Sequence, residues 1–307
     1  MSPKEVSLDA NTEPALHEIC VNDCDLAYVE RHLELKGHGP TLLLVHATGF
    51  HARVWDQIIA RLPACHSIAL DQRGHGRSEK KSIDDWRILG HDQAALVEAL
   101  DLDDIVGVGH SMGAHAMIDA AAIHPDRFRR LVLVDPTVAE PAAYAEAVSV
   151  DLGGRMHPAA KRRNRFESVD AMMERLADRS SFHLFEPKIF RDYCEYGLVP
   201  AEDGDGFVLA CPPEIEAAVY MTSRSNSGVY DSVRSLDIPV LILRARAPSP
   251  DVTGAMVFST SPTWPGLVDE FKQGRELHYP DRTHFLPMEI PDEVATLIAE
   301  ELASTSH

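Results

Sequence analysis

Short runs of aliphatic residues alternate with helix-length segments over the first 135 residues. Continuous apolar runs of this kind are typical of strands buried on both faces of a parallel sheet. The strand-length runs are Thr41–Val45, Ser67–Leu70, 104–109 and 131–134. The helix-length segments are 55–62, 91–100 and 111–123. Strands that alternate with helices of about ten residues form βαβ units. The sequence therefore predicts an α/β fold with a mostly parallel sheet flanked by helices, preceded by a hairpin within 19–36.

The alternation stops after Asp135 and Pro136, and the next 100 or so residues contain helical patterns but no buried strand. In the first of these helices apolar residues recur at helical spacing behind a Ser168 cap. The predicted helices are 169–176, Pro187–Tyr196 and 214–221. Strand patterns return at 238–243 and 276–279, with helices at 265–272 and 291–302. We therefore predict a core in two parts, 1–136 and 236–307, interrupted by a helical insertion at 137–235.

One segment carries the clearest chemical signal. The predicted strand 104–109 runs into Gly109-His110-Ser111-Met112-Gly113, which is followed by a helix. In a sharp strand-to-helix turn the two glycines prevent clashes and the serine hydroxyl projects outward. A dinucleotide-binding glycine loop is the competing interpretation, but such a loop normally opens the first βα unit of a fold. The context therefore favours Ser111 as a catalytic nucleophile.

The overall charge limits the partners of the chain. There are 29 Lys and Arg residues against 48 Asp and Glu residues, for a net charge of −19. Nucleic-acid binding requires a basic face, so no nucleic-acid partner is expected. We find no apolar run near the roughly 20 residues of a membrane span, and no secretory signal at the mixed-charge start. We expect a cytoplasmic protein without a membrane span.

The five cysteines do not form an evident framework. Their number is odd and they are scattered along the chain, which argues against a set of disulfides. Cys20 and Cys24 have the spacing of half a metal site, but no second ligand pair follows them. The sequence therefore predicts no metal.

Four blocks, in this order, resemble the α/β-hydrolase superfamily. They are His46-Ala47-Thr48-Gly49-Phe50, Asp71-Gln72-Arg73-Gly74-His75-Gly76-Arg77-Ser78, the turn around Ser111, and His284 with Glu289 and Pro291. The resemblance covers nearly the whole chain and points to the serine hydrolase branch. It implies the α/β-hydrolase fold, with the insertion at 137–235 as a helical cap or lid.

The resemblance also implies roles for individual residues. His284 follows the last predicted strand, as the catalytic histidine of the superfamily does, and an imidazole base is what a serine nucleophile needs. The oxyanion hole would use the backbone N–H groups of Met112 and Thr48. Ala47 departs from the usual His-Gly start of the first block, and Ala has less backbone freedom than Gly. Gly49 therefore remains an alternative donor.

The acid that orients His284 has two candidates. Most of the superfamily places it after the strand that corresponds to 239–244, in a turn with a glycine, but here that turn has no glycine and Asp251 comes about three residues late. A smaller branch places it after the preceding strand, about 24 residues beyond the nucleophile, where Asp135 lies. We favour Asp135, although an Asp-Pro turn residue is its structural alternative.

Two charged clusters have less direct interpretations. We interpret the block 71–78 as a structural turn that supports the nucleophile loop. The basic cluster 161–165 is either a solvated surface that pairs with nearby acids or a gate for anionic substrates. Bulky apolar residues of the insertion and two tryptophans are candidates for the substrate cleft, without individual assignment. They are Met172, Met173, Phe182, Phe185, Phe190, Tyr193, Tyr220, Trp55 and Trp264.

These features together predict a serine hydrolase that cleaves a small carboxylic ester or lactone through an acyl-enzyme intermediate. No cofactor is implied, and homo-oligomerisation is left open. The first alternative is a carbon-carbon bond hydrolase of vinylogous diketones, which usually keeps its acid in the later position. Another is a ligand receptor without turnover, and a cofactor-free oxygenase or perhydrolase is a further one. Dehalogenases and epoxide hydrolases of this superfamily need Asp in place of Ser111.

Overall fold

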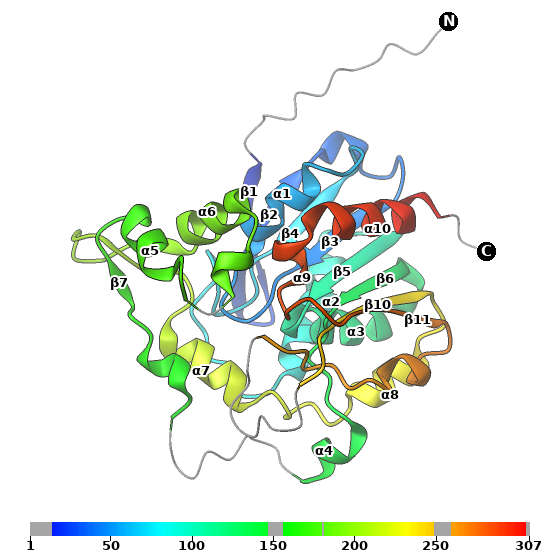
Figure 1. Cartoon of the computed structure of the whole chain (residues 1–307). Helices are drawn as coiled ribbons and strands as arrows, with labels where there is room; N and C mark the ends of the chain where they lie inside the picture. Colours follow the sequence, from blue (N-terminus) through cyan, green and yellow to red (C-terminus); the bar gives the residue numbers. More distant parts are fainter. Residues whose placement is uncertain (1–13, 147–155, 180, 249–258, 305–307) are drawn as a thin grey trace, which may run out of the picture.

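An eight-stranded sheet forms the centre of the computed structural model, which describes residues 14–146, 156–179, 181–248 and 259–304 (Figure 1). The strand order is β1-β2-β4-β3-β5-β6-β10-β11. β2 is antiparallel to both of its neighbours, and every later pair is parallel. The strands are β1 (Ala15–Val21), β2 (Cys24–Arg31), β3 (Thr41–Val45), β4 (Ser67–Leu70), β5 (Ile105–His110), β6 (Phe128–Val134), β10 (Val240–Ala245) and β11 (Gly274–Tyr279). The predicted mostly parallel sheet is confirmed.

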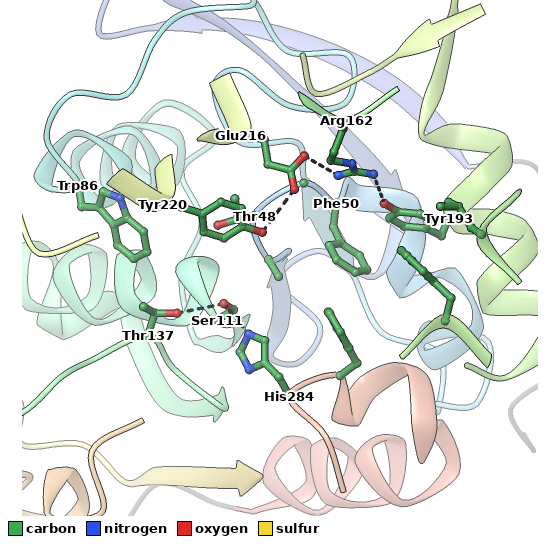
Figure 2. A pocket seen from close by; sticks show the side chains of 15 residues that line it. Thr48, Phe50, Trp86, Ser111, Thr137, Arg162, Tyr193, Glu216, Tyr220 and His284 are labelled. Carbon is green, nitrogen blue, oxygen red and sulfur yellow. Dashed lines mark hydrogen bonds and ion pairs between the residues drawn. The ribbon is translucent and has the colours of Figure 1, made fainter. Parts of the chain in front are cut away.

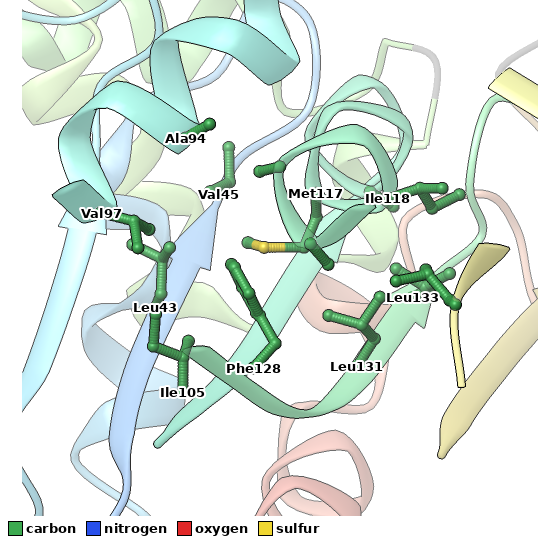
Figure 3. Packing of buried hydrophobic residues seen from close by; sticks show 14 of the residues in the cluster. Leu43, Val45, Ala94, Val97, Ile105, Met117, Ile118, Phe128, Leu131 and Leu133 are labelled. Carbon is green, nitrogen blue, oxygen red and sulfur yellow. The ribbon is translucent and has the colours of Figure 1, made fainter. Parts of the chain in front are cut away.

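Helices cover both faces of this sheet. On one face lie α2 (Arg87–Ala99), α3 (Met112–Ile123) and α8 (Val229–Ser235); on the other lie α1 (Asp56–Ile59) and α10 (Pro291–Ala303). Successive side chains of a strand point to opposite faces. In β3, Leu43 and Val45 therefore pack with the first set of helices (Figure 3), whereas Leu42 and Leu44 pack with the second. This double burial explains why the strands have continuous apolar runs.

The insertion contains a small sheet as well as helices. Its helices are α4 (Pro141–Glu146), α5 (Val169–Leu176), α6 (Pro187–Tyr196) and α7 (Pro213–Met221), and its strands are β7 (Arg165–Phe166), β8 (Leu198–Pro200) and β9 (Phe207–Leu209). The three strands pair antiparallel in the order β7-β9-β8. The insertion is therefore not purely helical as the sequence predicts, although each of these strands has at least one residue that is not buried. Strands of two or three residues are too short to show alternation, so pairing between distant segments defines them.

The ends of several helices also differ from the prediction. The segment 55–62 divides into a 3₁₀ turn, Ala52–Trp55, and the four-residue α1, while 265–272 contains only the 3₁₀ turn Leu267–Glu270. Other 3₁₀ turns and one further helix complete the described elements. They are Leu33–Leu35, Pro125–Arg127, Pro158–Lys161, Phe182–Leu184 and α9 (Leu286–Glu289).

The last helix of the insertion lies with the main sheet. α8 packs against α3, and its Val229 and Val233 belong to the same buried cluster as the first face of the sheet. α5, α6 and α7 instead lie beyond the strand ends (Figure 1). Within the described residues, no helix is both long and apolar enough to cross a bilayer.

Candidate active site

Ser111 occupies a strained turn between β5 and α3. Its backbone has φ 58° and ψ −116°, a conformation unusual for a residue with a side chain. A Cβ at Gly113 would lie 2.5 Å from the carbonyl oxygen of Val45, and one at Gly109 would overlap the backbone of Ala114. These close backbone approaches explain both glycines, and they leave the serine at the amino end of α3.

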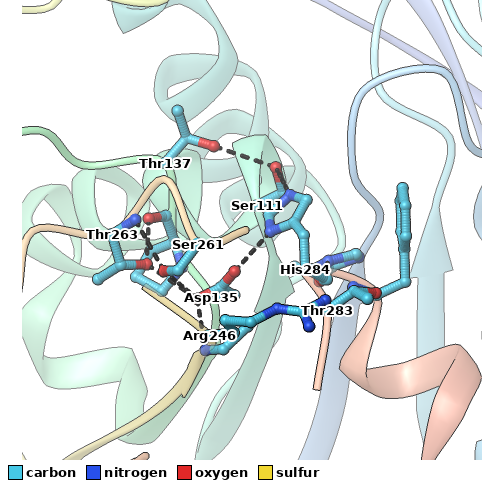
Figure 4. A network of polar contacts seen from close by, with 12 residues as sticks. Ser111, Asp135, Thr137, Arg246, Ser261, Thr263, Thr283 and His284 are labelled. Atoms are coloured by element: carbon cyan, nitrogen blue, oxygen red, sulfur yellow. Dashed lines mark hydrogen bonds and ion pairs between the residues drawn. The ribbon is translucent and has the colours of Figure 1, made fainter. Parts of the chain in front are cut away.

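His284 reaches Ser111 from the loop that follows β11 (Figure 4). Its Nε2 lies 2.9 Å from Ser111 Oγ, although 173 residues separate the two in the chain. The backbone carbonyl of His284 accepts a hydrogen bond from His110 Nε2 at 2.9 Å. Burial lowers the pKa of His110 well below its usual range, so this neighbour is a neutral hydrogen-bond donor.

Asp135 lies on the other side of His284, directly after β6. Its Oδ2 accepts a 2.6 Å hydrogen bond from His284 Nδ1, and its Oδ1 accepts from the Ala245 N–H at 2.9 Å and from the Ser261 hydroxyl at 2.6 Å. The carboxylate is fully buried, so these donors replace the water it has lost. The structure thus joins Asp135, His284 and Ser111 in one chain of hydrogen bonds. Asp251, the other candidate acid, lies outside the described residues.

The two expected oxyanion donors lie close together. The Thr48 hydroxyl donates to Met112 Sδ at 3.5 Å, and Thr48 lines the same cavity as Ser111. In the described part of the chain, neither the Thr48 nor the Met112 N–H donates to another backbone carbonyl. Because the positive φ in this loop falls at Gly49 (77°) and not at Ala47, the alanine is compatible with the loop conformation.

The serine opens into a cavity of about 190 Å³ (Figure 2). Phe182 and Tyr193 come from the insertion, as anticipated for some of its aromatic residues, and Phe50 and Phe285 come from the core. Neither of the two tryptophan candidates lines it; Trp55 is fully buried in the core, and the third tryptophan, Trp86, lines the cavity instead.

A cluster of polar side chains faces Ser111 across the cavity. Arg162 donates to Glu216 and, at 3.1 Å, to the Tyr193 hydroxyl, while the Tyr220 hydroxyl donates to Glu216 at 3.4 Å. Glu216 is only 4% exposed. Arg162 belongs to the basic cluster predicted from the sequence, and its charge is compensated by this carboxylate. The cluster is therefore polar but carries no net charge.

The charged side chains of block 71–78 form hydrogen bonds and an ion pair within the fold. Asp71 accepts hydrogen bonds from the N–H groups of Ala52 at 2.6 Å and Arg77 at 2.8 Å, and Arg73 forms a buried ion pair with Asp92. These contacts tie the loop after β4 to its neighbours. In the described residues, no group of three His, Cys, Asp or Glu side chains is arranged to hold a metal ion.

Several residues of this site are not among those predicted from the sequence. Glu216 and Trp86 reach the cavity through the folding of distant segments, and Ser261 supports Asp135 from 126 residues away. None has a local pattern that marks it. Thr137 could have been noticed, because it follows the favoured acid by two residues and its hydroxyl contacts Ser111 Oγ at 3.0 Å.

A mostly parallel eight-stranded sheet with a serine on the sharp turn after a central strand defines the α/β-hydrolase class of fold. The chain belongs to the alpha/beta hydrolase family, whose model matches residues 42–297. This assignment confirms the resemblance and the fold predicted from the sequence, and it makes the chain a hydrolase.

Individual relatives differ in their reactions. The chain is 29% identical to 2-(acetamidomethylene)succinate hydrolase of Mesorhizobium japonicum over 79% of its own length and 83% of that protein. It is 31% identical to a haloalkane dehalogenase of the same organism over 40% of each chain.

Solved structures show the same arrangement. That of E-2-(acetamidomethylene)succinate hydrolase matches with a TM-score of 0.71 at 24% identity, over 95% of this chain and all of the other. The structure of an enol-lactonase from Burkholderia xenovorans LB400 matches with a TM-score of 0.64 at 18% identity, over 94% of this chain and all of the other. At sequence identities this low, the structural similarity shows a shared fold and does not show a shared reaction.

Proposed function

We propose that the protein is a serine hydrolase that cleaves an uncharged carboxylic ester or lactone through an acyl-enzyme intermediate. The observation that carries the proposal is the continuous hydrogen-bond chain from Ser111 through His284 to Asp135. The Ser111 end of this chain lines the cavity. A serine becomes a nucleophile when a base lies within hydrogen-bond reach and a third group orients that base. The distances of 2.9 and 2.6 Å satisfy both conditions.

In the first half of the reaction, Ser111 Oγ bonds to the substrate carbonyl carbon while His284 Nε2 takes its proton. Asp135 holds Nδ1 and stabilises the imidazolium, and the N–H groups of Thr48 and Met112 stabilise the negative carbonyl oxygen. The bond to the leaving oxygen then breaks, and His284 gives that oxygen the proton. A lactone keeps its leaving group attached to the acyl chain.

The pairing of the charged side chains in the cavity wall supports an uncharged substrate. The Arg162 cation already pairs with Glu216, so an anionic substrate would have to compete with a buried carboxylate. Aromatic side chains supply much of the remaining wall. This environment suits an acyl group of modest size that buries apolar surface.

A second candidate is a hydrolase of an acidic amide. The observation in its favour is the likeness, over most of both chains, to a protein named for 2-(acetamidomethylene)succinate. An (E)-2-((N-methylformamido)methylene)succinate hydrolase from Acinetobacter baylyi is 30% identical over 38% of this chain and 45% of its own length. Such a substrate would need a cation free to bind its carboxylates. The position of Asp135 after β6 also counts against the carbon-carbon bond hydrolase, which usually has its acid after the later strand. Measured turnover of any substrate would exclude a ligand receptor without turnover.

The insertion at 137–235 would act as the cap of this enzyme, since Phe182, Tyr193 and Glu216 contribute to the cavity wall.

A cytoplasmic location is part of the proposal. It is supported by the free state of all five cysteines, including the exposed Cys20.

The test compares wild-type protein with Ser111→Ala on a chain-length series of aryl esters, on simple lactones and on 2-(acetamidomethylene)succinate. We expect ester or lactone turnover that Ser111→Ala reduces by roughly 10⁴-fold or more. Ser235→Ala, an exposed serine at the end of α8, is the matched control and should keep full activity. Turnover of the succinate alone would favour the second candidate, and equal ester turnover by Ser111→Ala would refute both.

A further inference from the structure

Thr137 contacts the nucleophile from a different direction than His284 (Figure 4). We propose that the Thr137 hydroxyl binds the water that hydrolyses the acyl-enzyme, and that it acts as a catalytic residue of the second half-reaction. The inference rests on the proposed function, because it requires an acyl group on Ser111. It concerns the second half-reaction, in which His284 again acts as the base.

The protons of the resting site can be assigned from the acceptors. His284 Nδ1 faces a carboxylate oxygen, so it carries the ring proton and leaves Nε2 as an acceptor. The single Ser111 proton is therefore donated to His284 Nε2. Thr137 Oγ1 lies 3.0 Å from Ser111 Oγ and must then be the donor of that contact. Thr137 also lines the cavity, and its hydroxyl oxygen keeps lone pairs that can accept a hydrogen bond.

A buried chain of polar groups holds Thr137 in place. Its N–H donates to the Ser111 carbonyl at 3.2 Å, and its carbonyl accepts from His115 Nδ1 at 2.9 Å. His115 Nε2 in turn accepts from Asn226 Nδ2 at 3.0 Å, and the other Nδ2 proton goes to Asp119 at 2.6 Å. His115 and Asn226 are at most 1% exposed. Each donor in this chain meets an acceptor, so the position of Thr137 is defined without reference to His284.

Acylation changes what the Thr137 hydroxyl can bind. Once Ser111 Oγ is an ester oxygen it has no proton and is a weaker acceptor, so the threonine hydroxyl becomes free to bind water. His284 Nε2 and Thr137 Oγ1 lie 2.9 and 3.0 Å from the same oxygen. In this proposal the hydrolytic water lies beside that oxygen, in contact with both groups.

The step balances with water as the only co-reactant. The water oxygen forms a bond to the acyl carbon while His284 Nε2 takes one of its protons, and the second proton is donated in a hydrogen bond to Thr137 Oγ1. The bond between the acyl carbon and Ser111 Oγ then breaks, and His284 returns its proton to Oγ. The products are the free carboxylic acid and the resting serine.

Replacement of Thr137 by valine keeps the shape of the side chain and removes the hydroxyl. If only deacylation is slowed, kcat and KM fall together and kcat/KM, which reports acylation, stays within about twofold of wild type. We expect kcat to fall by about 10- to 100-fold, as for loss of one well-placed hydrogen bond. A burst of alcohol release should precede the slow steady state, and Thr137→Ser should restore kcat.

Several results would overturn the inference. A fall in kcat/KM at constant KM would place Thr137 in acylation, and an unchanged kcat would leave it without a catalytic role. Thr296→Val, which removes an exposed hydroxyl on α10, is the matched control. Titration of Ser111 with a fluorophosphonate counts intact sites, and Thr137→Ala gives the same test if the valine variant does not fold. If Ser111→Ala retains turnover the proposed function itself fails, which is a separate outcome.

Discussion

At the scale of single residues, the site depends on how Asp135 is held. Its carboxylate is fully buried and accepts hydrogen bonds from His284, Ala245 and Ser261. The hydrogen bond from His284 Nδ1 to this carboxylate fixes both the ring orientation and the tautomer of the histidine. The role of Asp135 can be tested separately from that of Ser111.

Asp135→Asn should lower kcat by about 10³- to 10⁴-fold, because an amide does not hold the histidine in the required tautomer. Asp251→Asn removes the other candidate carboxylate and should leave kcat near wild type. Ester hydrolysis by both variants, with thermal unfolding to verify that each is folded, gives the comparison. Loss of activity in Asp251→Asn alone would reverse the assignment.

At the scale of elements, the turn between β5 and α3 depends on close backbone contacts. Gly113 has no room for a side chain, since its Cβ would lie within 2.6 Å of the carbonyl oxygens of Val45 and His46. These oxygens belong to β3 and the loop after it, which also contains Thr48. The nucleophile turn and the expected oxyanion loop are therefore packed directly against each other.

Gly113→Ala should destabilise the protein by about 1 to 3 kcal/mol or more and reduce kcat, because β3 and the turn must separate. Gly39→Ala is the matched control: a Cβ there meets nothing within 4 Å, so stability should change little. Urea unfolding of both variants measures the effect. Equal stability of the two would show that the turn has more freedom than its geometry implies.

The same elements show what sequence patterns can predict. The run Thr41–Val45 is apolar at both alternating sets of positions, and the motif around Ser111 requires a strand before it and a helix after it, so both were recognised. β7, β8 and β9 have two or three residues each, which is too short for a recognisable alternation. Glu216 and Ser261 join the site only through contacts made by the folded chain, which no local pattern encodes.

At the scale of the whole molecule, several histidines are buried as neutral groups. Burial lowers the pKa of His46 and His75 to about 3 and that of His51 to about 4, from an ordinary value of 6.5. The folded state therefore binds fewer protons than the unfolded state below about pH 6.5. Their contribution to stability is present above that pH and is lost as the pH falls.

The free energy of unfolding should decrease between about pH 6.5 and 5, by up to about 1.4 kcal/mol per pH unit for each such histidine. Urea midpoints measured across this range would show it, since most carboxylates titrate lower. His51→Gln should reduce the slope, whereas His38→Gln, at an exposed position, should not. A flat profile would contradict the buried neutral state.

The position of Asp135 also determines which segments of the chain supply the proposed catalytic side chains. Ser111 and Asp135 follow adjacent strands of one βαβ unit, and the Ser111 N–H bonds to the carbonyl of Val134. In the proposed mechanism, nucleophile and acid therefore come from one βαβ unit, and the acid is not supplied by the loop after β10. That loop keeps a supporting role, since Ser261 and Thr263 near its end donate hydrogen bonds to Asp135.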